Sequence, residues 1–330
     1  MNRNTLLRSS FLLTCMLLLI LDTKTALIGA KDGIALCLTA VIPSLFPFLF
    51  LSIAIKDSLT DTPASCLRPI AARLGIPPGA ESVLIASYLG GYPVGAQCVT
   101  LLYQNSQLSR KDAEHLLAFC NNAGPAFLFG MVGSFFPTPS AAWCLWAIHI
   151  LGSLFAAYLF FRVPENTSIP EKKISRNISP KNDWLKISIH AMSSICGWVI
   201  LFRVLLAFLS KWLLWFCPLP IQVILCGILE LTNGCLGLSY ISDLKLRFIV
   251  ANMLLSLGGL CVTMQTISVT SGLSLRFYFT GKIIQFLFSV TAACFLAYGN
   301  PVPLIVFFLF FLIAKRKNRK SSSIPKVFVV

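Results

Sequence analysis

Apolar runs long enough to cross a lipid bilayer recur along almost the whole chain. A transmembrane helix needs about 20 consecutive apolar residues. The runs of that kind lie at about 5–22, 33–55, 114–136, 138–161, 186–211, 246–268, 276–299 and 300–314. Hydrophobic residues make up 56% of the 330 residues and charged residues only 12%, more apolar surface than a soluble domain can bury. The sequence therefore predicts an all-α polytopic membrane protein with about eight transmembrane helices.

Two further apolar stretches, 79–104 and 218–240, are interrupted at their centres by Gly, Pro and polar residues. Basic loops predict the cytoplasmic side of a membrane protein. If 79–104 crossed the bilayer fully, the basic pair at 110–111 would face outward. A re-entrant hairpin at 79–104, with a second one at 218–240 from the opposite face, places every basic cluster and both termini in the cytoplasm.

This reading divides the chain into an inverted repeat with flanking segments. Residues 1–32 hold the N-terminal span, and 162–185 form a basic cytoplasmic linker between the repeats 33–161 and 186–299. Residues 300–330 hold the final span and a basic cytoplasmic tail. Each repeat reads span, hairpin, span, span. Broken segments at matching positions of opposed repeats indicate the binding site of a secondary transporter.

The formal net charge of +15 does not indicate a nucleic-acid partner, because basic membrane loops set topology and contact anionic lipid headgroups. HExxH, Walker A and GxSxG motifs are missing from the sequence, so we do not expect an enzyme. The cysteines are scattered and form no CxxC pair, and we expect neither a metal site nor a cofactor. The expected partner is the lipid bilayer, and a homo-oligomer is compatible with the sequence.

The first interruption, Gly90-Gly91-Tyr92-Pro93-Val94-Gly95, is the tip of the first hairpin. Glycine permits positive φ and close backbone approach, and proline fixes φ and removes a donor. An unwound tip exposes N–H groups at the start of a half-helix, and these attract anions such as carboxylates. A packing kink between helices is the alternative.

Polar residues also interrupt the predicted span 114–136, at Asn121, Asn122, Gly124 and Pro125. Pro125 frees a backbone carbonyl, which the two amides either satisfy or leave for a ligand. Hydrogen bonding between helices is the alternative role of these amides.

Glu230 stands in the second interruption and is followed by Thr232, Asn233 and Gly234. A carboxylate inside a membrane is costly and marks a functional site by default. The group could hold a coupling proton or cation. The alternative is a structural ion pair with the intramembrane residue Arg203.

The partner helix of the second half carries three weaker candidates, Gly258, Gly259 and Gln265. Lys282 either reaches the interface by snorkelling, which we favour, or offers a positive charge to an anionic substrate. We interpret His149 as a buried histidine whose hydrogen bonds are satisfied.

Several segments of this sequence resemble those of the YlbJ (SpoVV) family of sporulation integral membrane proteins. That family carries the nucleoside-recognition or Gate domain. The segments are VIPSLFPFLFLS (41–52), GGYPVGA (90–96), LLAFCNNAGPAF (116–127), GILELTNG (227–234) and SLGGLCVTMQ (256–265). The resemblance implies transport of a small anion, dipicolinic acid, across the outer forespore membrane.

The resemblance also implies the positions of the site residues. They are Tyr92, Pro93, Gly95, Asn121, Asn122, Glu230, Thr232, Asn233, Gly234, Gly258, Gly259 and Gln265. The residues themselves add Gly124 to the substrate candidates, and they make Glu230 and Arg203 candidates for ion coupling or structural charge. Gln97 stands where the family is expected to have a lysine, directly after the GYPxGA motif. This difference puts in doubt whether the chain shares the substrate or the affinity of the family. A nucleoside or other metabolite carrier and a non-transporting scaffold of a sporulation membrane complex remain the alternative functions.

Overall fold

The computed structural model describes residues 3–60, 66–160 and 183–309, and in these residues the regular elements are helices without any β-strand. Five helical segments in the described part are long and apolar enough to span a membrane. They are residues 23–51, 139–159, 184–212, 244–269 and 276–298. Shorter apolar helices lie at 5–21, 125–135 and 219–229. These helices agree with a multi-pass membrane protein.

The first half opens with one helix, followed by two helices that a π-helical turn, Cys37–Val41, joins into one long rod. A short helix, a helical hairpin, a broken helix and an unbroken helix follow. The elements are α1 (Arg3–Leu21), α2 (Thr23–Leu36), α3 (Ile42–Thr60), α4 (Arg68–Arg73), α5 (Ser82–Tyr88), α6 (Val94–Gln104), α7 (Arg110–Leu116), α8 (Pro125–Phe127) and α9 (Pro139–Leu159).

The second half repeats the order of long helix, hairpin, broken helix and unbroken helix. Its elements are α10 (Trp184–Trp212), α11 (Leu219–Leu229), α12 (Leu231–Gly237), α13 (Leu244–Leu257), α14 (Gly259–Val269) and α15 (Arg276–Tyr298). A further helical stretch covers residues 302–309. In both halves the two arms of the hairpin, α5 with α6 and α11 with α12, pack against each other.

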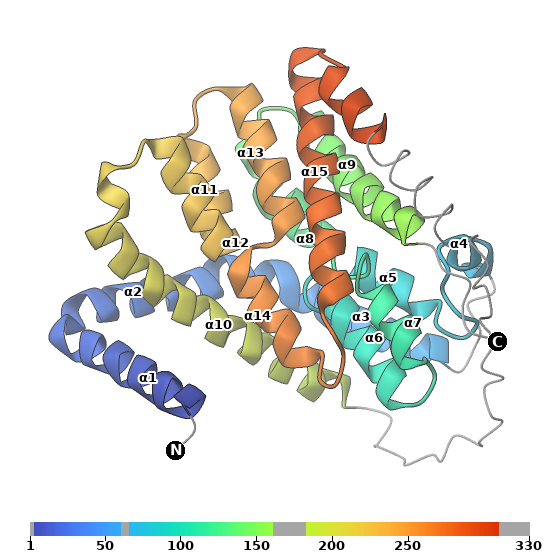
Figure 1. Cartoon of the computed structure of the whole chain (residues 1–330), viewed down its shortest axis with the longest axis horizontal. Helices are drawn as coiled ribbons and strands as arrows, with labels where there is room; N and C mark the ends of the chain where they lie inside the picture. Colours follow the sequence, from blue (N-terminus) through green and yellow to red (C-terminus); the bar gives the residue numbers. More distant parts are fainter. Residues whose placement is uncertain (1–2, 61–65, 161–182, 310–330) are drawn as a thin grey trace, which may run out of the picture.

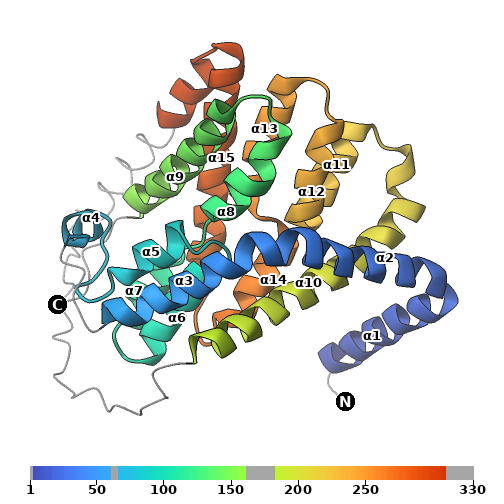
Figure 2. The ribbon, with the colours of Figure 1, turned by 180° about the vertical axis from the view of Figure 1, so that it is seen from behind.

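Corresponding elements of the two halves run in opposite directions. The α2–α3 rod crosses Figure 1 from left to right, and α10, which packs beside it, runs from right to left. The broken helix α7–α8 rises in that view, and α13–α14 descends. Figure 2 shows the α2–α3 rod on the near side of the molecule, where α3 packs against α5 of the first hairpin. Opposite directions of this kind are what an inverted repeat requires.

Two predicted spans differ from the structure. The span 114–136 is not one helix, because the chain leaves helical geometry between Leu116 and Pro125. Proline has no N–H to continue a helix. The span predicted at 33–55 begins at Thr23, ten residues earlier. Of the final span 300–314, only 302–309 is described as helix, and the basic tail lies outside the described residues, as does almost all of the linker 162–185.

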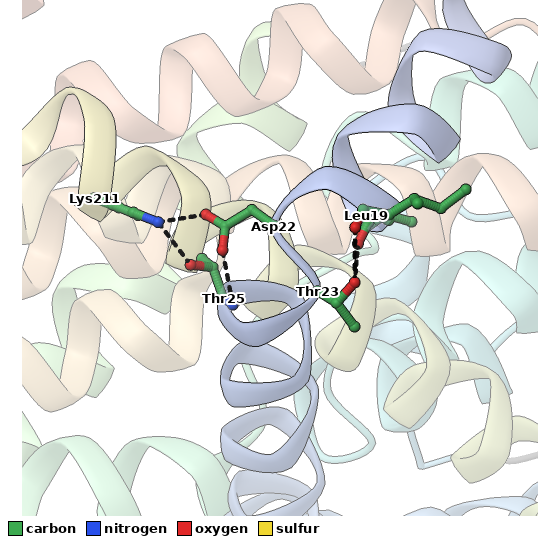
Figure 3. Close-up of polar contacts among 6 residues, drawn as sticks. Leu19, Asp22, Thr23, Thr25 and Lys211 are labelled. Carbon is green, nitrogen blue, oxygen red and sulfur yellow. Dashed lines mark hydrogen bonds and ion pairs between the residues drawn. The ribbon is translucent and has the colours of Figure 1, made fainter.

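The early start of α2 depends on polar contacts with the end of α10. Asp22 accepts a hydrogen bond from the backbone of Thr25 at 3.3 Å and so caps α2. Lys211 of α10 lies 2.5 Å from the Asp22 carboxylate and 3.3 Å from the Thr25 hydroxyl (Figure 3). Thr23 in turn donates to the carbonyl of Leu19 at the end of α1. These contacts join α1, α2 and α10 at one corner.

Two glycines one helical turn apart bring α2 against α10. A Cβ atom at Gly29 would lie 2.8 Å from the Cα of Val204, and one at Gly33 would lie 2.9 Å from the Cα of Ile200. Small residues at a spacing of four allow the backbones of membrane helices to approach closely.

Gly33→Ala is therefore expected to lower the free energy of unfolding by about 1–3 kcal/mol, because the methyl group meets backbone that cannot move aside. Unfolding of the purified protein in detergent measures the change. Gly197→Ala on α10 is the matched control, since nothing lies within 4 Å of its Cβ position. An equal response of the two variants would contradict this account of the α2–α10 contact.

Candidate functional site between the hairpin tips

The first hairpin tip packs directly on the unwound part of the first broken helix. Gly91 has a φ of +76°, and a Cβ atom there would lie 3.0 Å from the amide nitrogen of Gly124. At Gly95 the space of a side chain is taken by the carbonyl oxygen of Cys120. Pro93 caps α6 without a side-chain hydrogen bond. The first tip thus lies against the unwound segment through Gly91, which meets Gly124, and Gly95, which meets Cys120.

Glu230 forms the tip of the second hairpin. Its backbone is extended, and its carboxylate turns forward to cap α12. Oε1 accepts from the N–H of Thr232 at 3.0 Å, and Oε2 accepts from the N–H of Asn233 at 2.8 Å. The residue is buried, with an exposed fraction of 2%. The carboxylate therefore occupies the N-terminus of its own half-helix.

The second broken helix opens at Gly258 and Gly259, whose φ angles are +75° and +78°. Positive φ is the region that glycine adopts without steric cost. A Cβ atom at Gly259 would lie 2.7 Å from the carbonyl oxygen of Gly227 in the second hairpin. Gly234 also packs against Gly227. The second hairpin thus packs on the second break as the first packs on the first.

Arg203 is not an ion-pair partner of Glu230 among the described residues. Its guanidinium donates to Oδ1 of Asn233 and lies 3.5 Å from the carboxylate of Asp32. It lines a separate cleft of about 370 Å³ between α2, α10 and α11. The predicted alternative of a Glu230–Arg203 ion pair is therefore not found.

The two halves meet through the broken helices. The hydroxyl of Tyr92 donates to the carbonyl of Leu255 at 3.0 Å, and the side-chain amide of Asn121 donates to the hydroxyl of Thr266 at 2.8 Å. Tyr92 also packs beside Gly258. Each contact joins the first hairpin or the first break to the second broken helix.

A cavity of about 40 Å³ lies between the two tips. It combines predicted site residues of both halves with apolar residues of α3 and α10. Its wall consists of Val41, Leu45, Tyr92, Ala123, Gly124, Phe127, Ile195, Val199, Glu230, Leu231, Thr232, Val262 and Gln265. The other predicted residues do not line this cavity, and Arg203 lines the separate cleft.

A buried polar network behind the first tip was only partly predicted. Asn122 donates to the carbonyl of Phe119 at 2.7 Å and to the hydroxyls of Ser87 and Ser153 at 3.0 and 3.2 Å. Its Oδ1 accepts from Nε2 of Gln285 at 3.0 Å. Asn122 therefore links the first hairpin, the first break, α9 and α15.

His149 belongs to the same network, as a buried residue with an exposed fraction of 2%. Its Nε2 accepts from the N–H of Ala123 at 3.0 Å, and its carbonyl accepts from Nε2 of Gln285 at 3.0 Å. No hydrogen-bond partner is found for its Nδ1 among the described residues. The imidazole thus satisfies a backbone donor of the unwound segment, but its own bonding is incomplete.

Lys282 does not snorkel to the interface. It is buried, with an exposed fraction of 7%, and its Nζ donates to the Tyr92 hydroxyl at 3.0 Å and to Oε1 of Gln285 at 3.1 Å. The sequence carried a signal for this orientation. Lys282, Gln285 and Ser289 follow at helical spacing along one stripe of an otherwise apolar helix. Such a stripe faces the protein interior.

The chain is 27% identical to the sporulation integral membrane protein YlbJ of Bacillus subtilis (strain 168), over 86% of this chain and 80% of that protein. No family model and no solved structure matches the chain.

Proposed function

We propose that the chain, which is similar to the sporulation integral membrane protein YlbJ, is a secondary transporter of a small anionic metabolite. The observation that carries the proposal is the meeting of two broken hairpins at one buried cavity, with an intramembrane carboxylate in its wall. Broken helices of opposed repeats build the binding sites of many secondary transporters. Dipicolinic acid is the proposed substrate. The hairpins are taken as re-entrant from opposite faces of the outer forespore membrane, with both termini cytoplasmic.

The cavity in this structure is closed to such a substrate. Its volume of about 40 Å³ is room for a few water molecules at most. Pockets for organic ligands are typically about 300–1,000 Å³. Binding therefore requires the hairpin tips to move apart, and the Tyr92–Leu255 hydrogen bond is one contact that has to break.

Glu230 is the proposed site of a coupling proton or cation. It makes no ion pair among the described residues and is buried in the cavity wall. A buried carboxylate is stabilised by a bound cation or proton, and the stabilisation increases when an anionic substrate occupies the same cavity. The specific alternative is a scaffold without transport, and one observation favours it: both carboxylate oxygens already cap α12.

The substitution Glu230→Asn distinguishes the effect of the negative charge from the effect of capping α12. Asparagine is among the best N-cap residues but carries no charge. Uptake of labelled dipicolinate into proteoliposomes is expected to fall about tenfold or more in Glu230→Asn, equivalent to about 1.4 kcal/mol. Glu230→Asp, which keeps the charge, is expected to retain more activity.

Asp243→Asn is the matched control. Asp243 caps α13 through the N–H groups of Lys245 and Leu246 but is exposed. Full uptake by Glu230→Asn would exclude a charge role for Glu230. Absence of dipicolinate and uridine uptake by inserted wild-type protein, under proton and sodium gradients, would favour the scaffold.

A further inference from the structure

Lys282 is a buried amine without an acidic partner among the described residues. Its two hydrogen-bond acceptors are neutral, the Tyr92 hydroxyl and the Gln285 amide oxygen. The ammonium group also lies 4.7 Å from the centre of the Tyr92 ring. A buried charge is costly unless an opposite charge accompanies it, and neutral acceptors offset only part of that cost.

A purely structural role explains this arrangement poorly. Gln285 already joins Asn122 and the carbonyl of His149 through its Nε2 atom, so α15 is tied to the first half without the lysine. A methionine would fill the same space without a charge to bury, and such replacements are often neutral or stabilising.

The position of Lys282 connects it to the cavity. Tyr92 lines the cavity beside Gly124 and Glu230, and its hydroxyl accepts from Lys282. The lysine therefore contacts a residue of the cavity wall, Tyr92, from the side away from the cavity. Tyr92 belongs to the hairpin tip that has to move for a ligand to enter. An ammonium group has three donors, and the described contacts use two of them.

We propose that Lys282 binds a carboxylate group of the transported anion and so selects anionic over uncharged substrates. In the closed structure the Tyr92 hydroxyl and ring stand where the anion would bind. When the first tip withdraws from Leu255, the freed hydroxyl of Tyr92 and the ammonium group both donate to the incoming carboxylate. This role rests on the proposed transport function and names the residue that recognises the charge of its substrate.

The test compares two ligands that differ in charge but little in shape: dipicolinate and uncharged pyridine-2,6-dicarboxamide. Calorimetric titration of the full-length protein in detergent is expected to show that the wild type prefers dipicolinate to the diamide by about tenfold or more, as charge-assisted hydrogen bonds allow. Lys282→Met is expected to lose this preference without loss of thermal stability.

Lys245→Met is the matched control, because Lys245 also lies over a tyrosine ring, that of Tyr298 at 5.1 Å, but is exposed. It is expected to keep the wild-type preference. A Lys282→Met protein that keeps the preference, or that only loses thermal stability, overturns the role of Lys282 and leaves the transport proposal standing. A wild type that binds the diamide as tightly as dipicolinate overturns both, and this failure is visible before any variant is made.

Discussion

Gly95→Ala is expected to detach the first hairpin from the unwound segment and to lower the free energy of unfolding by about 3 kcal/mol or more. The added methyl group would overlap the carbonyl oxygen of Cys120, and a Cβ atom there also approaches the Cα of Ser87 within 3.1 Å. These neighbours are backbone atoms, which no side-chain rotation can move aside. Denaturant unfolding in detergent micelles measures the loss.

Gly130→Ala is the control for this change. It lies in the same half, in the π-helical turn Leu128–Val132, and nothing lies within 4 Å of its Cβ position. We expect little change in its unfolding midpoint. If Gly95→Ala were as stable as Gly130→Ala, the close docking of the first tip on the first break would be wrong.

Asn122→Ala is expected to cost about 2–4 kcal/mol of unfolding free energy and to abolish uptake. The substitution removes the hydrogen bonds to Ser87, Ser153 and Gln285 at once. It leaves a donor of Gln285 unpaired in a site that excludes water, and a buried unpaired group carries its full desolvation penalty.

Asn252→Ala tests whether the loss of any buried amide has the same effect. Asn252 is equally buried, with an exposed fraction of 1%, but among the described residues its amide donates only within α13, to Phe248 at 2.9 Å. We expect a cost below about 1 kcal/mol for it, in line with the mean for hydrogen bonds in membrane proteins. Similar losses in the two variants would show that Asn122 has no special place in joining the helices.

The two hairpins could be predicted from the sequence because the residues that interrupt each helix lie next to one another in the chain. Glycine and proline interrupt apolar runs at 90–95, and a buried carboxylate with glycine and asparagine interrupts the run at 227–234. The sequence predicts a continuous span over 114–136, although the helix is broken between residues 116 and 125. The apolar residues on both sides keep the mean hydropathy of the whole segment high. Its amides and Pro125 nevertheless marked the position of the break.

The early start of α2 could not be predicted in the same way. Residues 23–32 contain Lys24, Lys31 and Asp32, which argue against a span when the segment is read alone. In the fold, Asp32 pairs with Arg203 and the helix begins at the Asp22–Lys211 contact. The compensating charges lie more than 150 residues away in the sequence. The orientation of Lys282 depends in the same way on a distant residue, Tyr92.

The two breaks are held open by different means. Pro125 begins α8 and has no N–H group, so a helix continued across it would lack one backbone hydrogen bond and would be kinked. Gly258 and Gly259 keep their N–H groups, and only their positive φ angles separate α13 from α14. Rotation at these two residues would join the segments into one helix of 26 residues, Leu244–Val269. The two halves therefore differ in how easily the break can close: rewinding costs a backbone hydrogen bond at Pro125, whereas at Gly258 and Gly259 it needs only a change of backbone angle.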